Sequence, residues 1–188
     1  GAEVVQDCLT CLSEVRPSAA FLSLDFENAY NSLERAAVLA AVGERCPGLW
    51  AVARTFCGGR TVHWWTGAAG DRAQPVVATR GVDQGCPLSP ALFAIGIAPA
   101  LEALQDRLRT RDPGARVFAY LDDVYLVISP GLAGWAMGIV EDLFGPFGLK
   151  LNRSKTRIWI PDEDIFEEQG QLDADLDDLR VPVLPCLG

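Results

Sequence analysis

Two apolar runs separated by a pair of aspartates constrain the fold of this chain more than any other feature. Residues 118–121 and 124–128 are apolar and β-prone, and Asp122 and Asp123 lie between them. The pattern predicts a β-hairpin with a tight reversal at Asp122-Asp123. Two carboxylates at a hairpin tip repel each other, and a divalent cation relieves that repulsion. The alternative is an Asp pair that serves only the turn, because Asp tolerates turn geometry.

Apolar periodicity and turn residues predict the other elements. We expect helices over 2–15, 33–42, 49–56, 89–108 and 135–144, and strands over 20–26, 61–66, 75–80, 149–152 and 156–160. Asn31-Ser32 is expected to cap the second helix, and residues 81–87, with two glycines and a proline, form an irregular loop. This order predicts an α+β fold of the split βαβ (ferredoxin-like) kind, an antiparallel or mixed sheet with helices on one face.

Asp25 lies near the end of the first predicted strand. In a split βαβ sheet this strand can lie beside the central hairpin, which would bring Asp25 to Asp122 and Asp123. Three carboxylates without a histidine suit Mg²⁺, which prefers oxygen ligands and also accepts phosphate oxygens. Two such ions roughly 3.5–4 Å apart activate an attacking oxygen and stabilise a leaving one. The constellation therefore predicts phosphoryl transfer, as in a polymerase or nuclease.

Length and composition limit the other possibilities. With 188 residues and 49% hydrophobic content, the chain can bury one sizeable core, and its start at Gly1 rather than Met fits a piece of a longer protein. No apolar run reaches the length of a membrane span, so a membrane partner is not expected. The six cysteines are scattered through apolar surroundings, which favours reduced thiols and an intracellular location. His63, the only histidine, is expected to be a packed strand residue.

The net charge of −9 arises mainly from one stretch. Residues 161–180 contain nine acidic residues and the single base Arg180, whereas residues 1–160 are nearly neutral. Such a run is usually a solvated loop or insert. The acidity of the whole chain therefore does not exclude a nucleic-acid partner for residues 1–160.

Several short segments of this chain form an ordered set of motifs. They are residues 24–30 (LDFENAY), 80–90 (RGVDQGCPLSP), 120–123 (YLDD), 148–156 (GLKLNRSKT) and 186–188 (CLG). In this order they resemble the motifs of the palm of a reverse transcriptase. Residues 24–30 resemble its first catalytic motif, and residues 80–90 resemble the RGxxQGxPLSP block of non-LTR retrotransposon and group II intron enzymes. Residues 120–123 resemble the YxDD box, residues 148–156 resemble the GLxxNxxKT segment, and residues 186–188 resemble the start of the next motif.

The resemblance implies roles for individual residues. Asp25, Asp122 and Asp123 would hold two Mg²⁺ ions, with Mn²⁺ as a substitute and the Phe26 carbonyl as a further ligand. Lys155 would act on the departing pyrophosphate, where a cation or proton donor stabilises developing charge.

Further residues would bind the substrate. Tyr30 would exclude a nucleotide with a 2′-hydroxyl, and Phe26, Arg80, Gln84 and Gly85 would contact the incoming nucleotide or template. Asp83 departs from relatives, which often have a basic or neutral polar residue there.

The resemblance also implies an activity and an organisation. We expect residues 1–160 to be the palm, with most of the fingers missing, residues 161–180 to be an acidic loop or insert, and residues 181–188 to begin the next motif, without a thumb. The implied activity is RNA-directed DNA synthesis from dNTPs on a DNA primer and an RNA template, with fingers and thumb from the same polypeptide. The isolated piece is expected to be inactive, and a eukaryotic retroelement would place it in the nucleus.

Two other functions fit parts of the sequence. One is a catalytically silent retroelement remnant or nucleic-acid-binding scaffold that kept the palm fold. The other is an RNA-dependent RNA polymerase, which is disfavoured because Tyr30 stands where such enzymes tend to have a second acid and the box reads YLDD rather than GDD.

Overall fold

The computed structural model describes residues 1–67, 72–83, 85–162 and 172–184 and forms two compact units. Unit 1 comprises Gly1–Glu27 and Pro99–Gly188, and unit 2 comprises Asn28–Ala98. The predictions for Gln84, for residues 163–171 of the acidic stretch and for residues 186–188 lie outside the described residues. Within the described part, no helix is long and apolar enough to cross a membrane.

Unit 1 contains a four-stranded sheet and helices from both halves of its sequence. Its elements are α1 (Ala2–Val15), β1 (Ala20–Leu24), β4 (Arg116–Tyr120), β5 (Asp123–Ile128), η2 (Pro130–Leu132), α6 (Ala133–Phe144), η3 (Gly145–Phe147), β6 (Arg157–Trp159) and η4 (Ala174–Leu179). Unit 2 contains α2 (Ala29–Ser32), α3 (Arg35–Arg45), η1 (Pro47–Leu49), α4 (Trp50–Cys57), β2 (Thr61–Trp65) and β3 (Gln74–Ala78). Helix α5 (Ser89–Arg109) begins in unit 2 and ends in unit 1.

The sheet of unit 1 has the predicted split βαβ topology. Its strand order is β4-β5-β1-β6, and every pairing is antiparallel. Strand β1 lies beside β5, from Ala20 opposite Ile128 to Leu24 opposite Val124, as the sequence predicted. The α+β fold class is therefore confirmed.

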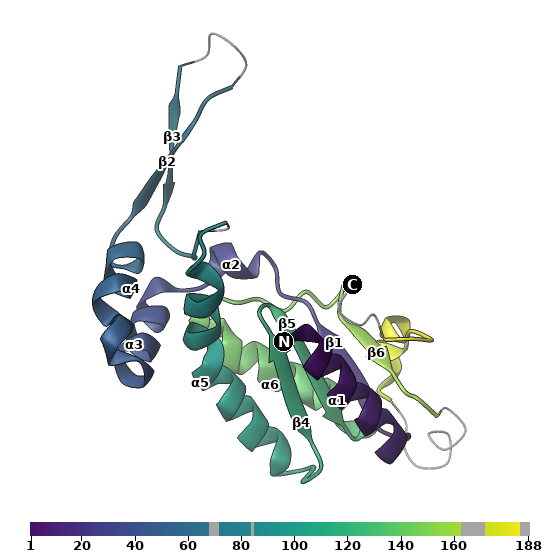
Figure 1. The fold of residues 1–188 in the computed structure, drawn as a ribbon. Helices are drawn as coiled ribbons and strands as arrows, with labels where there is room; N and C mark the ends of the chain where they lie inside the picture. Colours follow the sequence, from purple (N-terminus) through teal and green to yellow (C-terminus); the bar gives the residue numbers. More distant parts are fainter. Residues whose placement is uncertain (68–71, 84, 163–171, 185–188) are drawn as a thin grey trace. The chain divides into compact units, whose positions relative to one another are not determined.

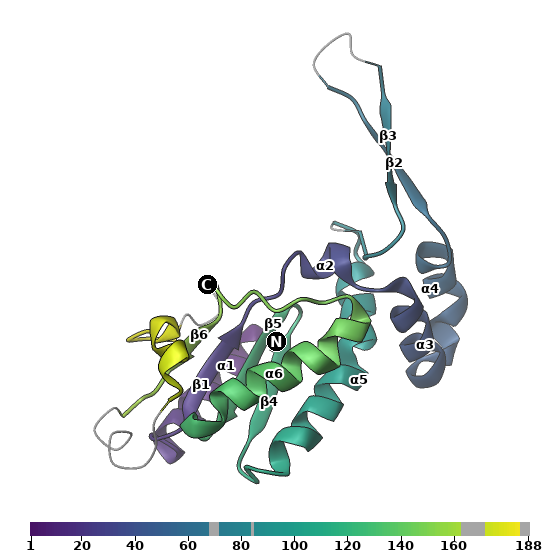
Figure 2. The ribbon, with the colours of Figure 1, turned by 180° about the vertical axis from the view of Figure 1, so that it is seen from behind.

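Helices cover both faces of this sheet (Figures 1 and 2). On one face, Val5 and Leu9 of α1 pack in a buried cluster with Phe21, Tyr125 and Val127. On the other face lies α6, whose Phe144 ring stacks on Phe26 at a centroid distance of 5.1 Å. Helix α1 thus covers the face opposite to α6, so the prediction that the helices lie on one face of the sheet was wrong.

Two local predictions were wrong by a few residues. The hairpin reverses at Leu121-Asp122, because Tyr120 pairs with Asp123 and Asp123 already belongs to β5. Leu121 has a φ of 59°, a left-handed conformation that is strained for a leucine. Asn31 and Ser32 do not cap α3, since they lie inside the short helix α2, and Glu34 precedes α3.

The described part of the acidic stretch belongs to unit 1 and packs beside strand β6. Leu172 and Leu176 are buried, and Arg180 forms an isolated parallel bridge with Ile158 of β6. The acids of η4 therefore lie on a segment that is held by apolar side chains rather than on a wholly solvated loop.

Asp112 fixes the loop before β4 to the end of β5. It accepts hydrogen bonds from the Gly114 N–H at 2.9 Å, the Ser129 N–H at 2.8 Å and the Ser129 hydroxyl at 2.9 Å, and it forms an ion pair with Arg16 at 3.1 Å. Burial raises the pKa of its carboxyl, but the hydrogen bonds from Ser129 and the Arg16 guanidinium outweigh burial, so the pKa lies below its ordinary value.

The Asp112→Ala substitution is expected to lower the free energy of unfolding by roughly 3 kcal/mol, because buried donors lose their acceptor. Since the folded pKa is depressed, this stabilisation is present above the unfolded value of about 4 and is lost as pH falls through the folded pKa. Urea unfolding of both proteins at neutral pH and at pH 3 tests this prediction. A difference in unfolding free energy that is as large at pH 3 as at neutral pH would contradict it.

Candidate active site

The ends of β1 and β5 bring two of the predicted acids to the same edge of the sheet. Leu24 is opposite Val124, and one further step in this register places Asp25 opposite Asp123. Residues at opposite positions of an antiparallel pair have Cα atoms roughly 4.5–5.5 Å apart and side chains on the same face. Asp122 is the neighbouring turn residue. The fold thus brings Asp25 to the edge of the sheet that carries Asp122 and Asp123, which are far from it in the sequence.

Electrostatics show that the three groups interact. Burial raises the pKa of the Asp123 carboxyl above its ordinary value, and the charges of Asp122 and Asp25 raise it further. Among the described residues, no cationic side chain lowers the pKa of Asp123, so the negative charges of the three acids repel one another. A divalent cation would relieve this repulsion.

The oxygen atoms of the three acids are of the type that binds a hard cation. Their side chains, however, do not form a recognisable metal-binding cluster among the described residues. Among the described residues, no group of three or more His, Cys, Asp or Glu side chains is arranged so that it could hold a metal ion. The three acids supply only oxygen donors, which suits Mg²⁺ rather than zinc.

The backbone at Phe26 offers a further oxygen on the same side. Phe26 forms a bridge with Leu151, and the flanking bonds run from the Glu27 N–H to the Lys150 carbonyl at 2.9 Å and from the Asn152 N–H to the Asp25 carbonyl at 2.8 Å. Neither bond uses the Phe26 carbonyl. In an antiparallel pair of this kind, the backbone groups of the bridged residue point away from the partner, so this carbonyl points toward the side of β5.

Lys155 lies in the turn that starts beside Asp25. Asn152 donates to the Asp25 carbonyl and its own carbonyl accepts from the Lys155 N–H at 3.1 Å. The Lys155 side chain is exposed. The turn therefore places an exposed cationic side chain on a loop that is hydrogen-bonded to the strand end carrying Asp25.

Unit 2 brings together Tyr30 and the loop that starts at Arg80. The Val82 N–H donates to the Tyr30 carbonyl at 2.8 Å, and the Gly81 N–H donates to the Leu33 carbonyl at 2.7 Å. The Tyr30 ring stacks on Phe93 of α5 with a centroid distance of 4.6 Å and an interplanar angle of 15°. Two segments predicted to contact the nucleotide are thus joined within one unit.

Arg35 holds this loop and was missed by the sequence-based reasoning. Its side chain is 5% exposed. It donates to the Gly81 carbonyl at 2.8 Å and the Thr61 hydroxyl at 2.6 Å, and also to the carbonyls of Gly59 and Ala78. One guanidinium therefore connects α3 to the base of the β2–β3 hairpin and to the Gly81 loop. The available signal was its spacing, since Arg35 shares a face of α3 with buried Val38 and Val42.

The Arg35→Met substitution is expected to destabilise unit 2 by roughly 3 kcal/mol, because it leaves several buried carbonyl groups without a donor. Arg35→Lys should recover only part of this loss, since an ammonium cannot reproduce the planar fork of donors. Urea unfolding followed by tryptophan fluorescence measures both changes. An Arg35→Met protein whose free energy of unfolding lies within about 0.5 kcal/mol of the parent value would rule out this role, because ordinary surface substitutions have effects of that size.

His63 and Asp83 form a pair at the same loop. The His63 Nε2 lies 3.3 Å from an Asp83 carboxylate oxygen, and the His63 side chain is 51% exposed. The prediction that His63 is a packed strand residue was therefore wrong, because neither face of the hairpin is covered. Asp83, the acid that departs from the family pattern, thus has a partner within unit 2.

A cavity of about 400 Å³ lies beside this pair and is lined by Asn31, His63, Val76, Val77, Ala78, Thr79, Arg80, Gly81, Val82 and Asp83. Arg80 is exposed and lies 3.9 Å from Glu34. Arg80, which was predicted to bind the substrate, therefore lines the same cavity as residues at the base of the hairpin.

Gly85 was also predicted to bind the substrate. It is exposed and has a φ of 88°.

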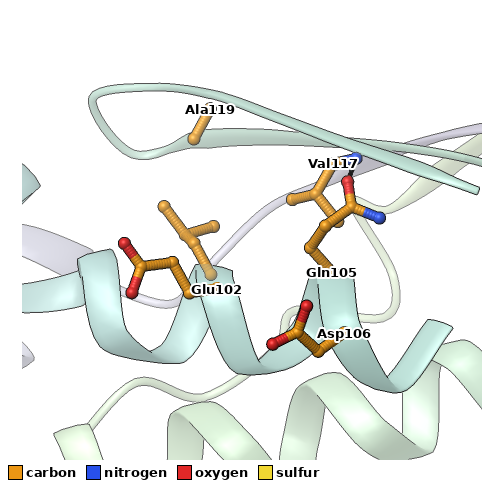
Figure 3. Close-up of a pocket in the computed structure, with 6 residues that line it drawn as sticks. Glu102, Gln105, Asp106, Val117 and Ala119 are labelled. Carbon is orange, nitrogen blue, oxygen red and sulfur yellow. Dashed lines mark hydrogen bonds between the residues drawn. The ribbon is translucent and has the colours of Figure 1, made fainter. Parts of the chain in front are cut away.

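A second cavity, of about 410 Å³, lies in unit 1 between α5 and β4 (Figure 3). The Gln105 side chain accepts from the Val117 N–H at 3.0 Å and donates to the Ala115 carbonyl at 3.0 Å, which covers part of the edge of β4. Glu102 and Asp106 add two carboxylates. None of the predicted site residues lines this cavity.

Comparison with known proteins assigns the chain to a family. A family model described as reverse transcriptase (RNA-dependent DNA polymerase) matches residues 2–173. This chain belongs to the reverse transcriptase family. The resemblance that the motifs indicated is thereby confirmed, and the YLDD box lies on the hairpin of a reverse transcriptase fold.

Two relatives of this reverse transcriptase chain are proteins of transposable elements. The Retrotransposable element SLACS 132 kDa protein of Trypanosoma brucei gambiense is 31% identical over 147 residues, which is 72% of this chain and 11% of that protein. The Transposon TX1 uncharacterized 149 kDa protein of Xenopus laevis is 32% identical over 138 residues, which is 66% of this chain and 10% of that protein. The chain thus spans about a tenth of the length of these relatives.

A solved structure shares the fold of this reverse transcriptase chain. Telomerase from Candida tropicalis, in complex with the TWJ fragment of telomeric RNA, matches with a TM-score of 0.60 and 13% identity over 83% of this chain and 29% of that chain. At this identity the match supports the fold alone.

Proposed function

We propose that this chain is the catalytic palm of an RNA-directed DNA polymerase that extends a primer 3′-hydroxyl with deoxynucleotides on an RNA template. The observation that carries the proposal is the register of β1 and β5, which brings Asp25 to the same edge of the sheet as Asp122 and Asp123. Membership of the family supplies the reaction class. Fingers and thumb would come from other parts of the same polypeptide.

The acids and the Phe26 carbonyl would hold two Mg²⁺ ions, with Mn²⁺ as a substitute. The ions would supply activation of the attacking oxygen and stabilisation of the leaving one. In the reaction, the primer 3′-oxygen forms a bond to the α-phosphorus of the nucleotide while the bond from that phosphorus to pyrophosphate breaks. Lys155 would stabilise or protonate the departing pyrophosphate. The three carboxylates provide the compensating negative charge that keeps the cations in place.

In unit 2, Tyr30 would exclude a ribose 2′-hydroxyl, because a ring packed against the sugar leaves no room for another oxygen. Stacking on Phe93 and the backbone bond to Val82 hold Tyr30 in place. Arg80 would bind a phosphate, and Gln84 and Gly85 would complete the pocket, where glycine allows close backbone approach.

The test is primer extension by the polypeptide that contains this chain, with a DNA primer annealed to an RNA template, Mg²⁺ and dNTPs. The proposal expects extension that requires the RNA template and dNTPs. Extension with NTPs instead would favour an RNA polymerase. Binding of the primer–template without any extension would favour a silent scaffold that retained the fold.

A further inference from the structure

The β2–β3 hairpin presents aromatic and apolar side chains to solvent on both faces. Trp64 is 68% exposed and Trp65 is 60% exposed, and Val76 and Val77 are about half exposed. The hairpin consists of only two strands, with His63 opposite Val76 and Trp64 opposite Pro75 (Figure 1). A two-stranded ribbon with uncovered apolar faces is marginally stable in water. A partner that covers at least one face is therefore expected.

The charge of the hairpin favours a polyanion. Residues 60–80 contain Arg60, Arg72 and Arg80 and one acid, whereas the whole chain has a net charge of −9. All three arginines are exposed. Exposed aromatic rings interleaved with basic side chains are the features that bind single-stranded nucleic acid, because bases stack on the rings and phosphates contact the cations.

One face of the hairpin continues the cavity beside the Arg80 loop. Successive strand residues point to opposite faces, so Trp65 lies on the same face as His63, and Trp64 lies on the other. His63 and Val76, which face each other across the hairpin, both line the 400 Å³ cavity together with Arg80 and Asp83. The Arg35 bonds and the His63–Asp83 pair fix the base of the hairpin to this loop. The Trp65 face therefore adjoins the cavity that contains Arg80.

We propose that the Trp65 face of the β2–β3 hairpin binds the single-stranded template, with Trp65 stacking on a base and Arg80 contacting the backbone phosphates. That the bound nucleic acid is the template rests on the proposed function. In a polymerase, the template base that pairs with the incoming nucleotide is still unpaired when it reaches the site. The ligand chemistry itself, a flexible strand with free base faces, follows from the exposed ring and the arginines. Trp64 lies on the opposite face and is the matched control.

The experiment measures binding of a fluorescently labelled single-stranded RNA to the chain by anisotropy, at low salt and without divalent cations. Trp65→Ala is expected to weaken binding roughly ten-fold, the effect of losing one base–aromatic stack. Trp65→Phe should retain most of the affinity, and Trp64→Ala should change it less than about two-fold. Ultraviolet cross-linking with mass spectrometry should place the RNA on Trp65. Equal melting temperatures of the Trp64→Ala and Trp65→Ala proteins would show that both fold alike.

Unchanged affinity of the Trp65→Ala protein would overturn the proposal, as would cross-links confined to other tryptophans. Loss of self-association in that variant, with RNA affinity unchanged, would also overturn it and identify the face as a protein-packing surface. Glu141→Gln, which changes an exposed ion pair of unit 1, should leave RNA binding intact. If the parent polypeptide binds RNA through Trp65 but does not extend primers, the proposed function fails while this inference stands.

Discussion

The Asp123→Asn substitution is expected to reduce primer extension by on the order of 10³-fold or more and, in metal-free buffer, to raise the melting temperature. The loss of extension follows because one charged oxygen ligand that would hold the cations disappears. The gain in stability follows because burial, Asp122 and Asp25 all disfavour a charged Asp123 in the folded state. Activity and stability should thus change in opposite directions at one residue.

The pH dependence of the Asp123 effect has a definite sign. Because the folded pKa is raised, the contribution of this group to stability is fully present below the unfolded value of about 4 and is lost as pH rises through the folded pKa. The difference in melting temperature between the Asp123→Asn and parent proteins should therefore grow from pH 4 upward and then level off. Thermal melts across this range, with and without Mg²⁺, measure it.

A surface acid in unit 1 provides the control. The Glu141 carboxylate accepts two hydrogen bonds of 2.8 Å from Arg153, which lower its pKa, so Glu141→Gln should leave extension intact and should not raise the melting temperature. Mg²⁺ should raise the melting temperature of the parent and have little effect on Asp123→Asn. A metal-free Asp123→Asn protein that melts below the parent would refute the electrostatic account.

The Gly81→Ala substitution is expected to destabilise unit 2 by roughly 2–5 kcal/mol, the sum of a backbone penalty and an overpacking penalty. Gly81 has a φ of 78°, and a Cβ there would lie 2.6 Å from the Asn31 Cα and from the Asn31 carbonyl oxygen. These are backbone atoms of α2, which cannot move aside as a flexible side chain can. The Arg80 loop and Tyr30 should lose their shared geometry, and primer extension should fail with it.

Gly85 is the matched control in the same loop. Its φ of 88° is equally left-handed, but a Cβ there would meet nothing within 4 Å. Gly85→Ala should therefore cost only the backbone penalty of about 1–2 kcal/mol. Urea unfolding followed by the fluorescence of Trp50, Trp64 and Trp65 reports on unit 2. Equal losses of unfolding free energy in the two variants would show that contact with α2 is not what requires glycine at residue 81.

Most of the sheet of unit 1 could be predicted because its pattern is local. The apolar runs around Asp122 and Asp123 have the period and composition of strands, and the family motifs set their order. The reversal lies one residue earlier than predicted, because nothing in the residue pattern indicates a left-handed conformation at Leu121. Turn residues are predicted from glycine and asparagine preferences, and a strained leucine violates them.

The connections within unit 2 could not be predicted from local patterns. Arg35 reaches four acceptors that come from different parts of the sequence, and only the folded chain brings them together. His63 was predicted to be packed because no second histidine or partner acid lies at motif spacing, whereas it is exposed beside exposed Trp64 and Trp65 and pairs with Asp83. An apolar run indicates a strand, but it does not show whether another layer covers that strand.

The central claim is that carboxylates from β1 and β5, which are neighbours in the sheet but distant in the sequence, form one catalytic site. Primer extension by the polypeptide with Asp25→Asn tests this claim most directly. The control is Glu27→Gln, which removes the acid two residues later that forms an ion pair with Lys150 at 2.9 Å. The account predicts that the polypeptide with Asp25→Asn does not extend the primer on an RNA template, whereas the polypeptide with Glu27→Gln does. Extension by Asp25→Asn at the rate of the parent would contradict the account.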